Sequence, residues 1–67
     1  MVKTGKVINA ETAGDKTIVN IDFMDNTKAK VVLPNEDYHK YKDKYVICGI
    51  DFHDNINILE IVDHASE

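Results

Sequence analysis

Apolar and polar side chains alternate along most of this chain, which is the pattern of half-buried β-strands. The alternation is clearest from Val19 to Phe23, where Ile21 stands between Asn20 and Asp22. The same pattern predicts strands at residues 6–12, 16–24, 27–33, 45–52 and 56–62. We therefore expect an all-β fold.

The second and fourth predicted strands end in a near-repeat. Residues 21–26 read Ile-Asp-Phe-Met-Asp-Asn and residues 50–55 read Ile-Asp-Phe-His-Asp-Asn, so only Met24 and His53 differ. In both copies an Asp-Asn pair, which is typical of tight turns, separates two runs of strand-forming residues. Each copy therefore predicts a β-hairpin. A duplication and a chance match in a chain rich in Ile, Asp and Asn are both open explanations.

The length of the first hairpin loop can be predicted from the requirement that one face of the hairpin be wholly apolar. A two-residue loop at 25–26 would place Phe23 opposite Lys28, whereas a three-residue loop at 25–27 places Phe23 opposite Ala29. Because a shift of one residue turns every side chain to the other face of the sheet, we expect the three-residue loop.

In the second hairpin the same reasoning favours a two-residue loop at 54–55, which pairs Ile50 with Leu59 and turns Leu59 inward; a three-residue loop would oppose Ile50 to Glu60. Four apolar side chains are then predicted on the outer face of the last two strands: Ile47, Ile56, Ile58 and Val62. Partial burial under the helix or the terminus is the alternative. If exposed, such a patch on a small protein marks a site for a partner or for self-association.

A short helix is predicted between the third and fourth strands. Pro34 ends the third strand because it has no N–H to donate. Asn35 can cap a helix, with Glu36 and Asp37 at its positive end. The element order, three strands, a short helix and two strands, predicts a single small five-stranded barrel over residues 1–67, OB-like or SH3-like. We expect residues 63–67 to form a frayed acidic tail.

This size and element order resembles the cold-shock proteins and the smallest bacterial initiation factor in architecture. Cold-shock domains stack bases on exposed aromatic side chains of their second and third strands. The corresponding strands here contain Phe23 as their one aromatic residue, and the alternation points it inward. The resemblance therefore implies the topology and does not extend to a family.

The charge balance argues against sequence-specific DNA recognition. The net charge is −4, from 12 acidic residues and 8 basic residues that are all lysine. Arginine, whose planar fork grips phosphates and guanine edges, is absent. Residues 28–46 are mildly basic, whereas residues 47–67 contain five carboxylates and no lysine. A composition rich in Ile, Lys, Asn and Asp suggests an AT-rich coding source, a low-GC bacterium or its phage.

The single cysteine and the N-terminal sequence indicate the cellular compartment. Cys48 is the single cysteine, so an intrachain disulfide is impossible, and it lies in an apolar run where we expect a buried thiol. No apolar signal segment follows Met1 and no apolar run approaches the length of a membrane span. We therefore expect a cytoplasmic protein.

The residues best suited to chemistry form a weak constellation. Asp51 and His53 are two apart in a predicted strand and could share a metal ion or act as an acid–base pair, with Asp54 beside them. A solvated hairpin tip explains the same residues, because turns select Asp and Asn. The chain has no Ser-His-Asp set and no glycine-rich phosphate loop. We expect neither an enzyme nor a cofactor or metal.

Two functions follow from the pattern. The first is a non-enzymatic, acidic protein-interaction module, an inhibitor or accessory protein that docks on a protein partner or on a second copy as a homodimer. The second is an OB-like binder of single-stranded nucleic acid that uses the segment 38–45, where aromatic rings interleave with lysines: Tyr38, Lys40, Tyr41, Lys42 and Lys44. The spacing of three and four residues between the tyrosines favours instead an apolar stripe that plugs one end of the barrel, and the net negative charge likewise favours the first function.

Overall fold

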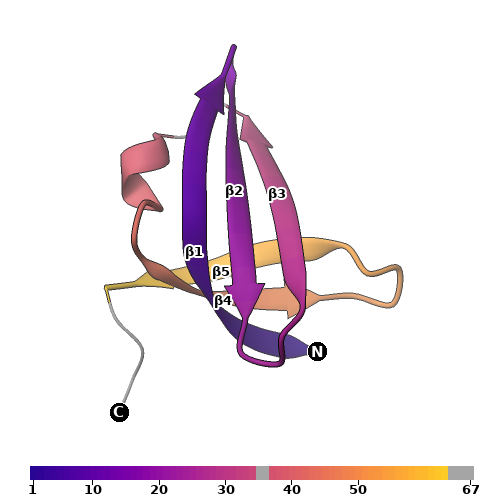
Figure 1. Ribbon diagram of the computed structural model, residues 1–67. Helices are drawn as coiled ribbons and strands as arrows, with labels where there is room; N and C mark the ends of the chain where they lie inside the picture. Colours follow the sequence, from indigo (N-terminus) through magenta and orange to yellow (C-terminus); the bar gives the residue numbers. More distant parts are fainter. Residues whose placement is uncertain (35–36, 64–67) are drawn as a thin grey trace.

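The computed structural model describes residues 1–34 and 37–63. Its elements, in chain order, are β1 (Val2–Ala13), β2 (Lys16–Phe23), β3 (Lys28–Pro34), the 3-10 turn η1 (Tyr38–Lys40), β4 (Tyr45–Ile50) and β5 (Ile56–Val62). All paired strands are antiparallel, and their order in the sheet is β3-β2-β1-β4-β5 (Figure 1). The prediction of a small all-β, barrel-like fold with this element order is confirmed.

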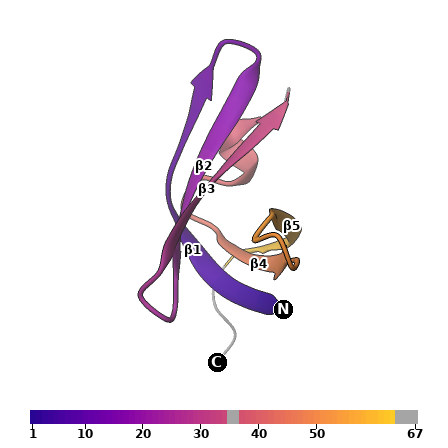
Figure 2. The same cartoon turned by 90° about the vertical axis from the view of Figure 1, so that its right-hand side faces the viewer.

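The long strand β1 joins two parts of the sheet. Residues 5–13 of β1 pair with β2, while residues 2–6 pair with β4. The sheet curls at this shared strand, so that β4 and β5 run across the direction of β1, β2 and β3 (Figures 1 and 2). The order β4-β1-β2-β3 is that of a Greek key, in which the fourth strand returns to lie beside the first. The result is a curled half-barrel.

Gly5 lies where β1 pairs with both neighbours. A Cβ at this position would lie 2.5 Å from Cγ2 of Ile21 and 2.9 Å from Cδ1 of Phe23. Glycine is therefore needed here for packing, because both of those side chains are buried.

The core fills the concave side of the sheet. The alternation predicted for β2 is confirmed, since Val19, Ile21 and Phe23 are all buried. The other buried apolar side chains among the described residues are Val7, Val31, Tyr41, Val46 and Cys48. Both parts of the sheet thus contribute to one core, which makes the protein a single packed unit.

The first hairpin has the predicted loop length in a different place. The N–H of Phe23 donates to the carbonyl of Thr27 (2.8 Å), so the loop consists of residues 24–26. Ile21 consequently faces Ala29, and the predicted pairing of Phe23 with Ala29 is wrong. The loop begins one residue earlier because Asn26 takes the left-handed conformation (φ 69°) that closes it. Moving the loop by one residue shifts the pairing by two, so the faces stay as predicted.

The second hairpin differs more from the prediction. Ile50 pairs with Ile56 and Cys48 pairs with Ile58, and a bulge then follows, because Ile47 pairs with Glu60. The extra residue of the bulge is Leu59. Ile56 and Ile58 therefore pack against the core, whereas Leu59 is 61% exposed. The expected pairing of Ile50 with Leu59 is wrong, and so is the outward placement of Ile56 and Ile58.

The connection between β3 and β4 is shorter than a regular helix. η1 is a single 3-10 turn, and Asp37 caps it by accepting a hydrogen bond from the N–H of His39 (3.0 Å). The predicted cap, Asn35, and its neighbour Glu36 lie outside the described residues, as do positions 64–67 of the expected tail.

Strands β3 and β5 are the two edges of the sheet, and they differ in chemistry. The edge strand β3 carries Lys28, Lys30 and Pro34, which are residues that discourage further strand pairing. The edge strand β5 contains neither lysine nor proline, and its one charged residue is Glu60.

Candidate docking surface

The two copies of the near-repeat form the same kind of turn, displaced by one residue. In the first copy Phe23 is opposite Thr27, and the third loop residue, Asn26, has φ 69°. In the second copy the N–H of Asp51 donates to the carbonyl of Asn55 (3.1 Å), and the third loop residue, Asp54, has φ 62°. The loops are therefore residues 24–26 and 52–54. The one-residue displacement decides where each phenylalanine lies.

Phe23 and Phe52 occupy the same position in the repeat but opposite environments. Phe23 is the last residue of β2 and is 5% exposed. Phe52 is the first loop residue of its hairpin and is fully exposed, with a relative accessibility of 104%. Apolar surface of this size is normally removed from water, so a fully exposed phenylalanine at a loop tip is a candidate contact for another molecule.

Asp51 holds the loop that presents Phe52. Its Oδ1 accepts hydrogen bonds from the backbone N–H groups of His53 and Asn55, both at 2.9 Å. Its Oδ2 accepts a third from Nδ2 of Asn55 (3.1 Å). These bonds to the charged form, with those from Asn55 contributing most, lower the pKa of Asp51. The loop is thus ordered by its own hydrogen bonds, and Phe52 is displayed on a fixed backbone.

Met1 lies beside this loop. Its amino group donates to the carbonyl of Ile50 (3.0 Å), and its carbonyl accepts from the N–H of Ile50 (2.7 Å). A hollow of about 350 Å³ lies here, lined by Met1, Ile50, Phe52 and the two loop aspartates. The chain terminus and the β4–β5 loop therefore share one surface.

A second apolar group covers the other side of the same end. Val2 pairs with Gly49, and Leu59 lies over Gly49, where its Cδ1 would be 3.3 Å from an added Cβ. Val2 and Leu59 are 63% and 61% exposed. We give the name hairpin-end surface to these two groups, Met1 with Phe52 at the loop and Val2 with Leu59 at Gly49. It holds four of the seven large apolar side chains that are exposed among the described residues.

Two of the predicted interaction residues continue this surface and two do not. Ile47 pairs with Glu60, and Val62 pairs with Tyr45. Ile47 and Val62 therefore lie on the outer face, and both are half-buried. The other two predicted residues, Ile56 and Ile58, belong to the inner face.

Apart from the amino group of Met1, the charged groups at this end are carboxylates. Beside Phe52 stand Asp51 and Asp54, and Glu60 follows Leu59 on the outer side of β5. No lysine occurs anywhere in residues 47–67. An apolar surface with an acidic rim is complementary to an apolar socket with a basic rim.

The second predicted site, the segment 38–45, is divided between core and surface. Its predicted residues are Tyr38, Lys40, Tyr41, Lys42 and Lys44. Tyr41 is 6% exposed and belongs to the core, and Tyr38 is half-buried with its ring 4.1 Å from that of His39. Nζ of Lys44 lies 2.6 Å from Oδ1 of Asp63. The two other lysines, Lys40 and Lys42, are exposed. The segment does not present a row of open rings.

The constellation of Asp51, His53 and Asp54 has a conformational explanation. The carboxylate of Asp51 already accepts three hydrogen bonds within the loop. Within residues 1–34 and 37–63, no group of three His, Cys, Asp or Glu side chains is placed to hold a metal ion. These residues build the loop, and Phe52 is the side chain that the loop presents.

Sequence reasoning missed Phe52 and Leu59. The predicted two-residue loop at 54–55 leaves Phe52 at the end of a strand. The available signal was Asp51, since an aspartate that precedes an exposed aromatic residue can accept the N–H groups of the next turn. Leu59 was missed because a bulge has no distinct signature in this sequence.

Comparison with known proteins adds no relative. The chain matches no known protein-family model, no curated protein and no solved structure. In the part of the chain that the structure describes, no helix has the length and apolar character needed to cross a bilayer.

Proposed function

We propose that this protein is a non-enzymatic interaction module that docks on a protein through the hairpin-end surface. The observation that carries the proposal is Phe52, which is fully exposed on a loop ordered by three hydrogen bonds to Asp51. An aromatic side chain on an ordered backbone binds at a reduced entropic cost, because only its own two χ angles remain to be fixed. Aromatic residues are also enriched among the energetic centres of interfaces.

The partner's chemistry follows from the rim of the surface. Asp51 and Asp54 adjoin Phe52, and Glu60 adjoins Leu59. A partner with an apolar socket and basic residues around it would gain both apolar burial and charge attraction. A second copy of the chain is the less favourable occupant of the loop itself, since two acidic loops would face each other. Self-association would instead use the outer face with Ile47 and Val62.

The fold supports a binding role. The Greek key with an open fifth strand favours the OB-like over the SH3-like assignment, because the OB-fold is a partly open five-stranded Greek-key barrel. Such barrels serve many functions through grafted surfaces, so the surface and not the fold carries the functional argument. The proposed setting is the cytoplasm, where an inhibitor or accessory protein would meet its partner.

The test compares two side chains in the same place of two similar loops. Met24 and Phe52 are each the first residue of a three-residue loop, and Met24 is 62% exposed. We expect Phe52→Ser to abolish capture of the partner from lysates of the source organism, prepared with and without nuclease and read by mass spectrometry. Met24→Ser is the matched control and should leave capture unchanged.

Two further results would identify the chemistry. Capture should weaken as salt is raised, because the acidic rim contributes by attraction that salt screens. A captured protein that is retained equally by wild type and Phe52→Ser would contradict the proposal. So would a partner that is lost only after nuclease treatment, which would favour the nucleic-acid alternative.

A further inference from the structure

The outward face of β1, β2 and β3 carries two rows of polar side chains, each running across the three strands. The first row is Asn9, Asn20 and Lys30. The second row is Lys6, Asp22 and Lys28. Residues two apart in a strand share a face, so the two rows are neighbours.

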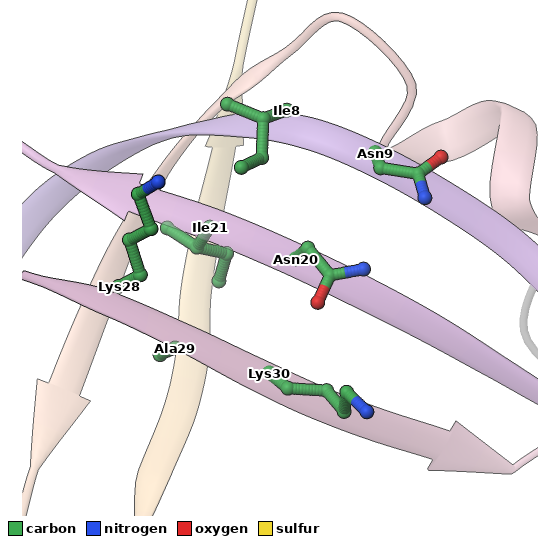
Figure 3. Close-up of a pocket in the computed structure, with 7 residues that line it drawn as sticks. All are labelled: Ile8, Asn9, Asn20, Ile21, Lys28, Ala29 and Lys30. Carbon is green, nitrogen blue, oxygen red and sulfur yellow. The ribbon is translucent and has the colours of Figure 1, made fainter.

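A hollow of about 430 Å³ is lined by all three residues of the first row and by Lys28 of the second. Ile8 forms one wall, and it is the extra residue of a bulge between Val7 and Asn9. The bulge leaves Ile8 53% exposed on the side of the asparagines and lysines. Figure 3 shows Lys28 bent over β2 toward Ile8, while Lys30 extends along β3. The hollow thus combines an apolar wall with amide and ammonium groups.

The polar groups around the hollow do not stabilise one another. Among residues 1–34 and 37–63, the side chains of Asn9, Asn20, Lys28 and Lys30 make no hydrogen bond or ion pair. Asparagine is disfavoured in strands, and here two asparagines stand opposite each other in adjacent strands without bonding. Their presence is not explained by strand formation, and their donors are free for a ligand.

We propose that this hollow binds a small phosphate ester. Lys28 and Lys30 place positive charge on two sides of the hollow, and lysine binds a phosphate as a compact positive charge. The amides of Asn9 and Asn20 suit the hydroxyl or amino groups of the attached moiety. Ile8 offers that moiety an apolar contact. The volume lies within the usual range for small-molecule sites, about 300–1,000 Å³.

A long nucleic-acid strand suits the hollow less well. Affinity for a polyanion comes mainly from neutralising many phosphates. The two rows supply three lysines and one aspartate, and the whole chain is acidic with a net charge of −4. A single phosphate group needs far fewer positive charges than a polyanion does.

The experiment is a titration followed by the amide resonances of the protein, with AMP, ribose phosphate, adenosine and a short oligothymidylate as probes. We expect AMP and ribose phosphate to shift the resonances of Asn9, Asn20, Lys28 and Lys30, and adenosine to shift none of them. The double change Lys28→Glu and Lys30→Glu should weaken AMP binding at least about tenfold, a loss of about 1.4 kcal/mol.

The control is the double change Lys16→Glu and Lys42→Glu, which alters the net charge equally at exposed lysines outside the hollow. It should leave AMP binding within about twofold of wild type. Lys28→Gln with Lys30→Gln repeats the loss without charge reversal, should the glutamates disturb β3. Equal binding of adenosine and AMP, binding of the oligothymidylate alone, or equal losses in both lysine pairs would each overturn the proposal.

Discussion

The ammonium of Lys3, on β1, lies 2.7 Å from the carboxylate of Asp25, in the loop between β2 and β3. The same ammonium lies 5.2 Å from the ring centroid of Phe23, so the ion pair spans the open side of a core residue. Thr27 adds hydrogen bonds to Asp25 from its backbone N–H and its hydroxyl. The hydrogen bond from Lys3, followed by those from Thr27, holds the pKa of Asp25 well below its usual range.

Stability should therefore fall in acid. The pKa of Asp25 is lowered by folding, so its contribution is complete above the unfolded pKa of about 3.9 and is lost as the pH falls through the folded value. The lowered pKa of Asp51 acts in the same direction. We expect Asp25→Asn to lose less stability than wild type between about pH 6 and about pH 2, measured by urea midpoints.

Asp15→Asn, in the turn between β1 and β2, is the control for this comparison, because no side-chain bond holds that carboxylate within the described residues. It should lose stability in parallel with wild type. An unchanged acid dependence in Asp25→Asn would show that the ion pair with Lys3 contributes nothing in solution.

The bulge in β5 predicts opposite results for two adjacent substitutions. Ile58→Lys places a charge against the core and should cost about 2–4 kcal/mol of unfolding free energy. Leu59→Lys changes an exposed side chain and should cost less than about 1 kcal/mol. Urea denaturation of both variants measures the difference. Equal costs, or a larger cost for Leu59→Lys, would mean that Leu59 faces the core, as it does in the register that pairs Ile50 with Leu59.

The glycines of β1 and β4 should also differ. Gly5→Ala brings a Cβ within 2.5 Å of Ile21 in the closed core and should cost about 1–3 kcal/mol. Gly49→Ala meets the exposed side chain of Leu59 at 3.3 Å, which can move aside. It should be neutral or stabilise by up to about 1 kcal/mol, because alanine restricts the unfolded chain. Thermal melting of the two variants measures the difference. A Gly5→Ala variant as stable as Gly49→Ala would mean that β1 does not pack closely against Ile21 and Phe23 of β2.

Cys48 should be protected from modification. Its side chain is fully buried, and burial raises the pKa of the thiol, so the reactive thiolate is scarce at neutral pH. We expect iodoacetamide to label the native protein far more slowly than the urea-unfolded chain, and in proportion to transient opening. Native labelling as fast as that of the unfolded chain would place Cys48 at the surface.

The sequence predicted the strands and the core face of β2 because both follow from local alternation. Val19, Ile21 and Phe23 are buried whichever loop closes the hairpin, since alternate registers that differ by two residues keep the same face. The positions of the two loops were predicted wrongly because Asn and Asp can both adopt positive φ. Asn26 takes this conformation in one copy and Asp54 in the other.

Both residue types tolerate the left-handed region, so the sequence offered two loops of similar cost in each copy. The choice at the second copy depends on Asp51, whose carboxylate organises residues 53 and 55 only after the chain has turned. The exposed position of Phe52 depends on that choice. The hairpin that forms the docking surface could therefore be predicted from the sequence, but the exposure of its central residue, Phe52, could not.

The unequal edges of the sheet limit how copies of this chain can stack. The lysines and the proline of β3 discourage pairing with another strand, whereas β5 has neither residue type and its backbone can pair. Two chains that pair β5 with β5 are related by a two-fold axis, and the two free edges of the joined sheet are then both β3 strands. Edge-to-edge association then stops at the dimer, because β3 does not pair with a further copy. The lysines and the proline of β3 therefore prevent the sheets from extending into a fibre.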